Sequence, residues 1–348
     1  MEELYTRIEA GVAYDALPGS PDVRQLQHPS LGTWTTFRKT LRPRYGVVWF
    51  DIAFCLLMMI GGFAAHIAVV SAWGNVFGLE VGILFALWIG FWLNALLTFG
   101  HEAAHYNLSA SRAQNDLLAD WTIWLFFPET TKNYRRSHWQ HHLHLGDLQD
   151  TEISYHNCLS PWFLARALTG IYLLELMSRY IFRPRSVASV RRAPSSAPSG
   201  SAANRITPVL RTAAIHSIFL GVAILFHAYA SALIWAIAVV FVFPFFASTR
   251  QILEHRAADA ACTMDFGVVP QGPVNRLFGT DLFSCYFGAA GFNRHLLHHW
   301  DPTVSYTRFD EMQAFFNGTH LQGSLGKAQS SYAATFLALL RRARNAGA

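Results

Sequence analysis

The chain has 348 residues, of which 52% are hydrophobic and only 14% are charged. Soluble domains carry roughly 25% charged residues, so this composition argues against a soluble globular protein and indicates a membrane protein. The formal net charge of +5 comes from Lys and Arg that flank the apolar segments. Contact with anionic lipid explains such flanks better than binding to nucleic acid does, and we expect no nucleic-acid partner.

Four apolar segments approach the ~20 residues that a helix needs to cross a bilayer. We expect these spans at 47–73, 77–99, 209–230 and 233–247. The connections within the first pair and within the second pair are very short, so the spans should form two helical hairpins. Neither connection contains any of the 27 Lys and Arg residues. The positive-inside rule therefore predicts that both termini lie in the cytoplasm.

The predicted fold is an all-α membrane protein, with four transmembrane helices in two hairpins and a helical cytoplasmic cap that holds a two-metal site. In chain order we expect an N-terminal arm at 1–46, a first hairpin at 47–99, a cap segment at 100–183, a flexible basic linker at 184–205, a second hairpin at 209–249, and a second cap segment at 250–348. Within the cap, an amphipathic stretch at 161–182 suits a helix on the membrane surface, and 332–344 suits a terminal helix.

The four cysteines contain no CxxC pair, which argues against an iron–sulfur or rubredoxin-like centre within the chain. On the predicted topology they lie in the membrane or on the reducing side. We therefore expect all four to be free thiols.

Nine of the sixteen histidines follow a spaced pattern beside the spans. The motif HEAAH follows the second span, EHR follows the fourth, and HWQHH and HLLHH lie further along. Spacings of three or four residues place imidazoles on one face of a helix. One first-row ion accepts about four to six ligands, so nine histidines predict two metals. The candidate ligands are His101, His105, His138, His141, His142, His255, His295, His298 and His299.

An all-imidazole ligand set suits iron, zinc, copper or nickel. A redox-active metal pair at the mouth of an apolar space suits attack on an unactivated C–H bond. A di-iron pair of that kind needs O2 and two electrons from outside.

Two other classes of protein are compatible with parts of the pattern. HEAAH matches the HExxH motif of zinc proteases, in which Glu102 would be the general base, but that interpretation leaves both HxxHH triplets and His255 without a role. A metal transporter or receptor would place polar ligands near the middle of the bilayer, whereas these boxes follow the spans.

The motifs HEAAH, HWQHH and HLLHH, in this order and together with the two hairpins, resemble the three histidine boxes of the integral-membrane fatty acid desaturase/hydroxylase superfamily. The resemblance covers about residues 47–310. It implies a four-helix stem with a cytoplasmic cap that holds two irons on nine histidines, with His255 as the separate ninth ligand. The segment GFNRHLLHHWDPTVSYTRF is more similar to a bacterial branch, which implies the bacterial inner membrane.

The resemblance also implies neighbours of the metal ligands. Gln251 matches the position of a polar residue that acts one turn before the ninth histidine, and Asp150 and Glu152 are similar to polar residues that accompany the boxes. Metal-bound histidines usually donate their second N–H to such groups. The other candidates are Glu102, His144, Asn293 and Asp301. Arg135 and Arg136, beside the second box, are candidates for binding the head group of a substrate.

The activity implied is that of an O2-dependent di-iron oxidoreductase, in the first place a desaturase of fatty acyl chains. Hydroxylation, decarboxylation to a terminal alkene, and desaturation of a small metabolite remain open, because the outcome depends on where the substrate carbon lies. The chain contains no HPGG motif of cytochrome b5, so a separate ferredoxin or cytochrome b5-type system is the expected electron donor.

Overall fold

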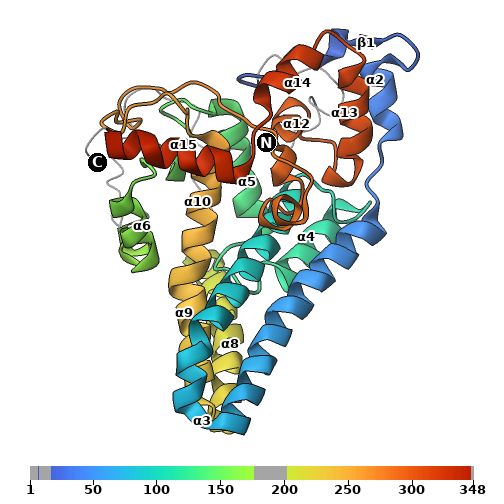
Figure 1. Cartoon of the computed structure of the whole chain (residues 1–348). Helices are drawn as coiled ribbons and strands as arrows, with labels where there is room; N and C mark the ends of the chain where they lie inside the picture. Colours follow the sequence, from blue (N-terminus) through green and yellow to red (C-terminus); the bar gives the residue numbers. More distant parts are fainter. Residues whose placement is uncertain (1–6, 8–16, 176–201, 346–348) are drawn as a thin grey trace.

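The computed structural model describes residues 7, 17–175 and 202–345, and this part of the chain is mostly helical, as predicted. Figure 1 shows a narrow bundle of long helices below a wider part. We call the bundle, formed by α3, α8, α9 and the start of α10, the stem, and the remaining described elements the cap. The cap includes a small antiparallel pair of strands, β1 (Gln27–His28) and β2 (Gly32–Thr33).

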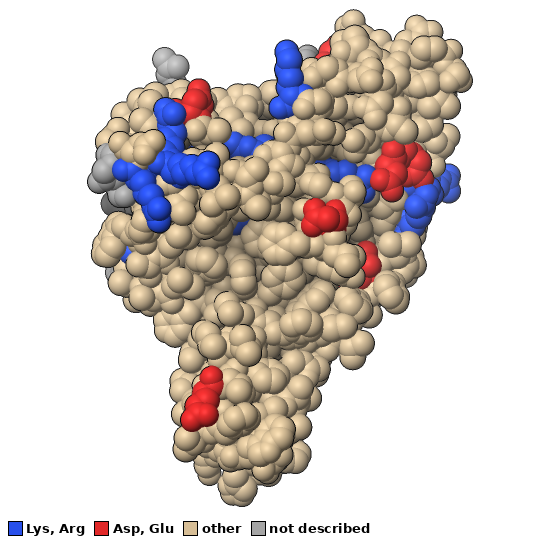
Figure 2. All heavy atoms as spheres, viewed as in Figure 1, with Lys and Arg blue, Asp and Glu red and all other residues tan. Residues whose placement is uncertain are grey.

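Within the described residues, three helical stretches are long and apolar enough to cross a membrane: Tyr45–Ala104, Ile206–Leu225 and Tyr229–His255. The stem exposes large apolar side chains, among them Leu57 (65%) and Leu84 (66%). On the face shown in Figure 2 the visible Lys and Arg side chains lie on the cap, and the lower stem is almost free of charge. Burying such a surface requires lipid, so the chain is a membrane protein.

The first stretch, α3 (Tyr45–Ala104), is a helical hairpin. Its backbone leaves the helical conformation at Gly74, where φ is 84° and ψ is 168°. The two arms then pack against each other, and the indole N–H of Trp88 donates to the carbonyl of Met58 at 2.8 Å. Gly62 permits this approach, since a Cβ there would lie 2.5 Å from the Trp88 ring. The turn lies in the short connection expected from the sequence.

The second hairpin turns earlier than predicted, at His227 (φ 54°). It consists of α8 (Ala202–Leu225) and a continuous helical path through α9 (Tyr229–Ile237), a π-helical turn, η6 (Ala238–Val242), and α10 (Phe243–His255). The predicted span ended at residue 247 because polar residues follow. The helix continues because those residues, Ser248 to Arg250, are buried against the rest of the protein instead of facing lipid.

Polar side chains join the two hairpins inside the stem. His66 on α3 contacts the hydroxyl of Ser231 (2.8 Å) and the carbonyl of Gly78 (2.9 Å). The amide of Asn75 bonds to the carbonyl of His227 and to the N–H of Ala230. Such bonds have few competitors in hydrocarbon, so they set how the hairpins dock.

The cap is built from short helices around two apolar clusters, one that includes Trp34, Trp139 and Phe315 and one that includes Phe163 and Leu339. Its α-helices are α2 (Trp34–Phe37), α4 (Arg112–Thr122), α5 (Thr131–His144), α6 (Pro161–Leu168), α11 (Leu282–Phe287), α12 (His295–Trp300), α13 (Phe309–Asn317), α14 (Gln322–Ala328) and α15 (Tyr332–Asn345). Its 3-10 turns are η2 (Val23–Gln25), η3 (Arg38–Thr40), η4 (Ser154–His156), η7 (Phe292–Arg294) and η8 (Tyr306–Arg308).

Two segments expected from the sequence differ from the structure or extend beyond the described residues. The helix expected at 161–182 is interrupted after α6 by a turn at Gly170, whose φ of 75° and contact with Phe241 leave no room for a Cβ. Most of the basic linker expected at 184–205 lies outside the described residues. The terminal helix expected at 332–344 is present as α15.

The prediction of four free thiols is wrong. Cys158, just after η4, and Cys262, in the loop after α10, form a disulfide with their Cα atoms 5.1 Å apart. Arg256 joins the same two loops by donating to the carbonyls of His156 and Ala261. The sequence gives no signal for this pairing, because the two cysteines are 104 positions apart and meet only in the folded cap.

The disulfide predicts the thiol count. Unreduced, denatured protein should bind two equivalents of a maleimide, at Cys55 and Cys285, and four after reduction. Mass spectrometry of the labelled protein gives the count, and Cys158→Ser should raise the unreduced count from two to three. Four labels before reduction would show that the bond is not formed in the purified protein.

Close helix packing predicts the effect of a methyl group. In Gly90→Ala the new Cβ would lie 2.5 Å from Val242 Cγ1 and 3.0 Å from the backbone nitrogen of Phe243. Overpacking of this kind costs about 1–3 kcal/mol, so the Tm in detergent should fall. Gly61→Ala is the control, since nothing lies within 4 Å of its Cβ position. Equal Tm values for the two variants would contradict the packing shown.

Candidate metal centre

The end of α3 carries the first two histidines out of the stem and into the cap. His101 is in the last turn and His105 is the residue after the helix, and both are buried. The last carbonyl groups of the helix have no partners within it. Arg135 on α5 provides hydrogen-bond donors for two of these carbonyl groups: its Nε donates to the carbonyl of Ala104 and its Nη2 to that of Ala103. Asn115 also donates to Ala103.

Three further helices supply the remaining histidines. The helix α5, capped by the Thr130 side chain, presents His138, His141 and His142. The end of α10 presents His255, and α12 presents His295, His298 and His299. All seven side chains are 2% exposed or less. The nine histidines predicted as ligands thus come together from four helices.

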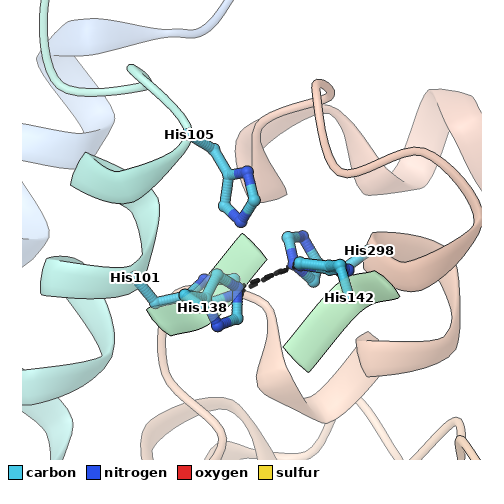
Figure 3. A group of neighbouring side chains, drawn as sticks. All are labelled: His101, His105, His138, His142 and His298. Carbon is cyan, nitrogen blue, oxygen red and sulfur yellow. Dashed lines mark hydrogen bonds between the residues drawn. The ribbon is translucent and has the colours of Figure 1, made fainter. Parts of the chain in front are cut away.

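The nine imidazoles divide into two neighbouring groups. Within each group one nitrogen of every ring lies within 4.8 Å of the others. The first group consists of His101, His105, His138, His142 and His298, and the second of His141, His255, His295 and His299. Figure 3 shows the first group, with rings from α3, α5 and α12 directed toward one another. The groups adjoin each other, since the rings of His142 and His299 are 4.6 Å apart.

The spacing of the nitrogens suits a metal ion. Imidazole nitrogens bind first-row metals at about 2.0–2.1 Å, so two neighbouring ligands of one ion lie about 2.8–3.4 Å apart, from octahedral to tetrahedral angles. The Nε2 atoms of His101 and His298 are 2.8 Å apart, and those of His138 and His142 are 2.9 Å apart. In the second group, Nε2 of His295 lies 3.0 Å from that of His255. Each group therefore offers four or five converging nitrogens.

Carboxylates orient two of the rings. His138 Nδ1 lies 2.9 Å from Glu152, whose second oxygen accepts from the amide of Gln251 at 2.7 Å. His141 Nδ1 lies 2.8 Å from Asp150, which also accepts from the hydroxyl of Tyr155 at 2.5 Å. With Nδ1 engaged in this way, Nε2 is left to bind a metal. Gln251 acts through Glu152, not directly on a histidine.

The ring of His255 is oriented by the backbone. Its Nδ1 lies 2.9 Å from the carbonyl oxygen of Val274. Neither this carbonyl nor the role of Tyr155 was expected from the sequence, because a carbonyl group carries no residue-specific signal and Tyr155 acts through Asp150.

The electrostatics favour neutral, metal-ready rings in most positions. Burial and the neighbouring imidazoles hold the pKa of His142 and of His299 well below the usual range. Burial also opposes protonation of His141, but Glu152 and Asp150 outweigh it and raise its pKa to about 9. Burial alone would raise the pKa of Glu152, yet His141 and then His138 hold it well below its usual range. Both carboxylates are thus ionised and placed to compensate a cation.

Several other predicted neighbours make different contacts. Glu102 accepts from the Ser305 hydroxyl (3.1 Å). Asp301 accepts from the Trp34 indole (2.9 Å) and Arg38, and so attaches the N-terminal arm to α12. Asn293 donates to the carbonyl of Gly279. His144 belongs to neither of the two histidine groups found among the described residues.

The two arginines beside the second box differ. Arg135 is buried, with Nη1 and Nη2 bonded to Asp116 and its remaining donors on α3, as described above. These contacts commit it to the end of α3 instead of to a head group. Arg136 is partly exposed.

A model of the fatty acid desaturase family matches residues 77–318, more than half of the chain. The chain belongs to the fatty acid desaturase family. It is therefore an oxidoreductase of the membrane desaturase/hydroxylase type, with histidine groups suited to a two-metal site. A search of curated proteins found no match.

The carboxylate contacts predict metal retention. Asp150→Asn should lower metal affinity about 10–100-fold, because the oriented ring of His141 loses its charged partner. Metal per chain, measured after dialysis against a weak chelator, reports the change. Asp147→Asn is the control, since Asp147 is exposed and bonds only within its own loop. Equal metal retention in the two variants would show that Asp150 does not support the centre.

Proposed function

We propose that this protein is an O2-dependent di-iron oxidoreductase that desaturates fatty acyl chains. The observation that carries the proposal is the division of nine buried imidazoles into two adjacent groups of five and four. Membership of the fatty acid desaturase family supports the substrate class. The nine histidines are the proposed ligands, with Glu152, Asp150 and Gln251 orienting them.

We further propose that the stem crosses the membrane four times, as two hairpins, with the termini and the cap in the cytoplasm. The reversal of α3 at Gly74 supports two crossings by that one helix. The concentration of Lys and Arg on the cap in Figure 2 supports the orientation. The Cys158–Cys262 disulfide favours the opposite side, since cytoplasmic thiols are usually kept reduced, so the proposed orientation rests on the charge pattern. A bacterial inner membrane and the domain limits expected from the sequence belong to the same proposal.

Two bound irons would supply the redox chemistry, which removes two hydrogens from adjacent CH2 groups while O2, two electrons and two protons become two waters. The chain itself contributes burial, which excludes water from the reacting carbons, and the ionised carboxylates that balance the charge of the metals. The electrons come from a separate donor of the ferredoxin or cytochrome b5 type.

The contacts of Glu102 argue against a zinc protease. A general base of an HExxH enzyme must face the metal-bound water. One carboxylate oxygen of Glu102 instead bonds to Ser305, and both histidines of the motif share their group with three more from α5 and α12. A single-zinc site leaves those additional imidazoles without a role.

Metal content tests the proposal. Purified protein should contain about two irons per chain, and His141→Ala or His298→Ala should lower the iron content and abolish product formation, since each removes a ligand from one group. His144→Ala is the control from the same helix as His141 and should keep both. One zinc and no iron in the wild type would overturn the di-iron proposal.

Products select among the reactions that the family performs. We expect bacteria expressing the chain to accumulate acyl chains with a new double bond, detected by mass spectrometry of their lipids. The His298→Ala variant gives the background. New hydroxy acids or terminal alkenes, without new double bonds, would replace desaturation by hydroxylation or decarboxylation as the reaction.

A further inference from the structure

The second arm of α3 and the path α9–η6–α10 run side by side with a constant register. A Cβ on Gly78 would lie 3.3 Å from Ala230 Cβ, one on Gly82 2.4 Å from Ile234 Cδ1, and one on Gly90 2.5 Å from Val242 Cγ1. All three pairs have the same sequence separation, so the helices are parallel. Continued toward the cap, this register places Asn94 opposite Phe246 and Thr98 opposite Arg250.

Both helices carry buried polar atoms without partners near this end of the interface. Asn94 is completely buried, and neither its amide nitrogen nor its oxygen has a hydrogen-bond partner within the described part of the chain. The same holds for the hydroxyl of Thr249, which is 4% exposed, and for Nε of Arg250. Native proteins rarely leave such groups unsatisfied, because each has lost its bonds to water. The unused donors and acceptor of Asn94 therefore point to a bound molecule.

We call Asn94, Thr249 and Arg250 the polar layer. It lies on the membrane side of the histidine groups. Asn94, Thr98, His101 and His105 follow helical spacing along one face of α3. At 1.5 Å per residue, Asn94 is about 10 Å along the axis from His101. On the facing helix, the Arg250 guanidinium lies 4.0 Å from the centre of the Phe292 ring, which packs 4.5 Å from His101. A chain passing from the stem toward the metals would meet this layer.

Charge decides which kind of group the layer accepts. Nη1 of Arg250 bonds to both carboxylate oxygens of Glu254, at 2.8 and 2.6 Å, and both side chains are buried. Because this pair is already neutral, an added carboxylate or phosphate would be a buried charge without compensation. A neutral hydroxyl or carbonyl adds no charge, and the carboxamide of Asn94 can bond to either one.

We infer that Asn94 binds a neutral oxygen-bearing group, a carbonyl or hydroxyl, on the part of the substrate that lies on the membrane side of the metals. The inference rests on the proposed function and narrows it: the preferred substrate is an oxygenated chain and not a plain alkyl chain. Asn94 is a positioning residue that sets specificity, since it lies away from the proposed metal ligands.

The test compares matched ligands on the purified full chain. Stearic acid and a series of its mono-keto isomers are titrated against wild type and Asn94→Leu, with binding measured by native mass spectrometry. The wild type should bind at least one isomer about tenfold or more tighter than stearic acid, and Asn94→Leu should lose that preference. Gln322→Leu, on exposed α14, is the matched control and should keep it.

Thermal stability provides a second, independent readout. Removing an unpaired buried carboxamide should raise the Tm of ligand-free Asn94→Leu, whereas removing a structural hydrogen bond would lower it. Any of three results would overturn the inference. These are a lower Tm for Asn94→Leu, a preference for a keto isomer that survives in Asn94→Leu, and equal binding of stearic acid and all its keto isomers by the wild type. Iron content is measured on the same samples, so a failure of the di-iron proposal is seen separately from a failure of ligand preference.

Discussion

Nine imidazoles in one buried volume are the feature on which the cap depends. Their Nε2 atoms lie about 3 Å apart across the helices. Such an arrangement is costly by itself and becomes favourable when ions draw the rings together. Bound ions would therefore hold together the four helices that supply the rings, α3, α5, α10 and α12. Metal binding and folding of the cap are expected to be coupled.

The structure surrounds this centre with contacts that limit movement. Arg135 caps the end of α3, Asp150 and Glu152 orient two rings of α5, and Asp301 attaches the N-terminal arm to α12. The Cys158–Cys262 disulfide and Arg256 link the loops that follow η4 and α10. Asp150 and Glu152 thus contact the histidine rings as expected from the sequence, whereas Arg135 and Asp301 fix the helices that carry the ligands through contacts that the sequence did not indicate.

Membership of the desaturase family leaves the substrate open, and the packing between α3 and α10 bears on that question. Small residues of α3 bring these helices into contact along the stem, and the pattern ends where Asn94 takes the next position in register. A purely apolar interface would be more stable. Polar groups retained at a stability cost beside a reactive centre are typical of ligand recognition.

Local patterns determined much of this protein from sequence alone. Apolar length predicted the stem helices, and spacing of three or four residues predicted all nine histidines, because helical periodicity depends only on neighbouring residues. Tertiary structure alone decided how the nine divide into groups, that Gln251 acts through Glu152, that Arg135 caps α3, and that Cys158 meets Cys262. Each of these joins residues from different elements, and such contacts depend on how the helices dock, which no local spacing encodes.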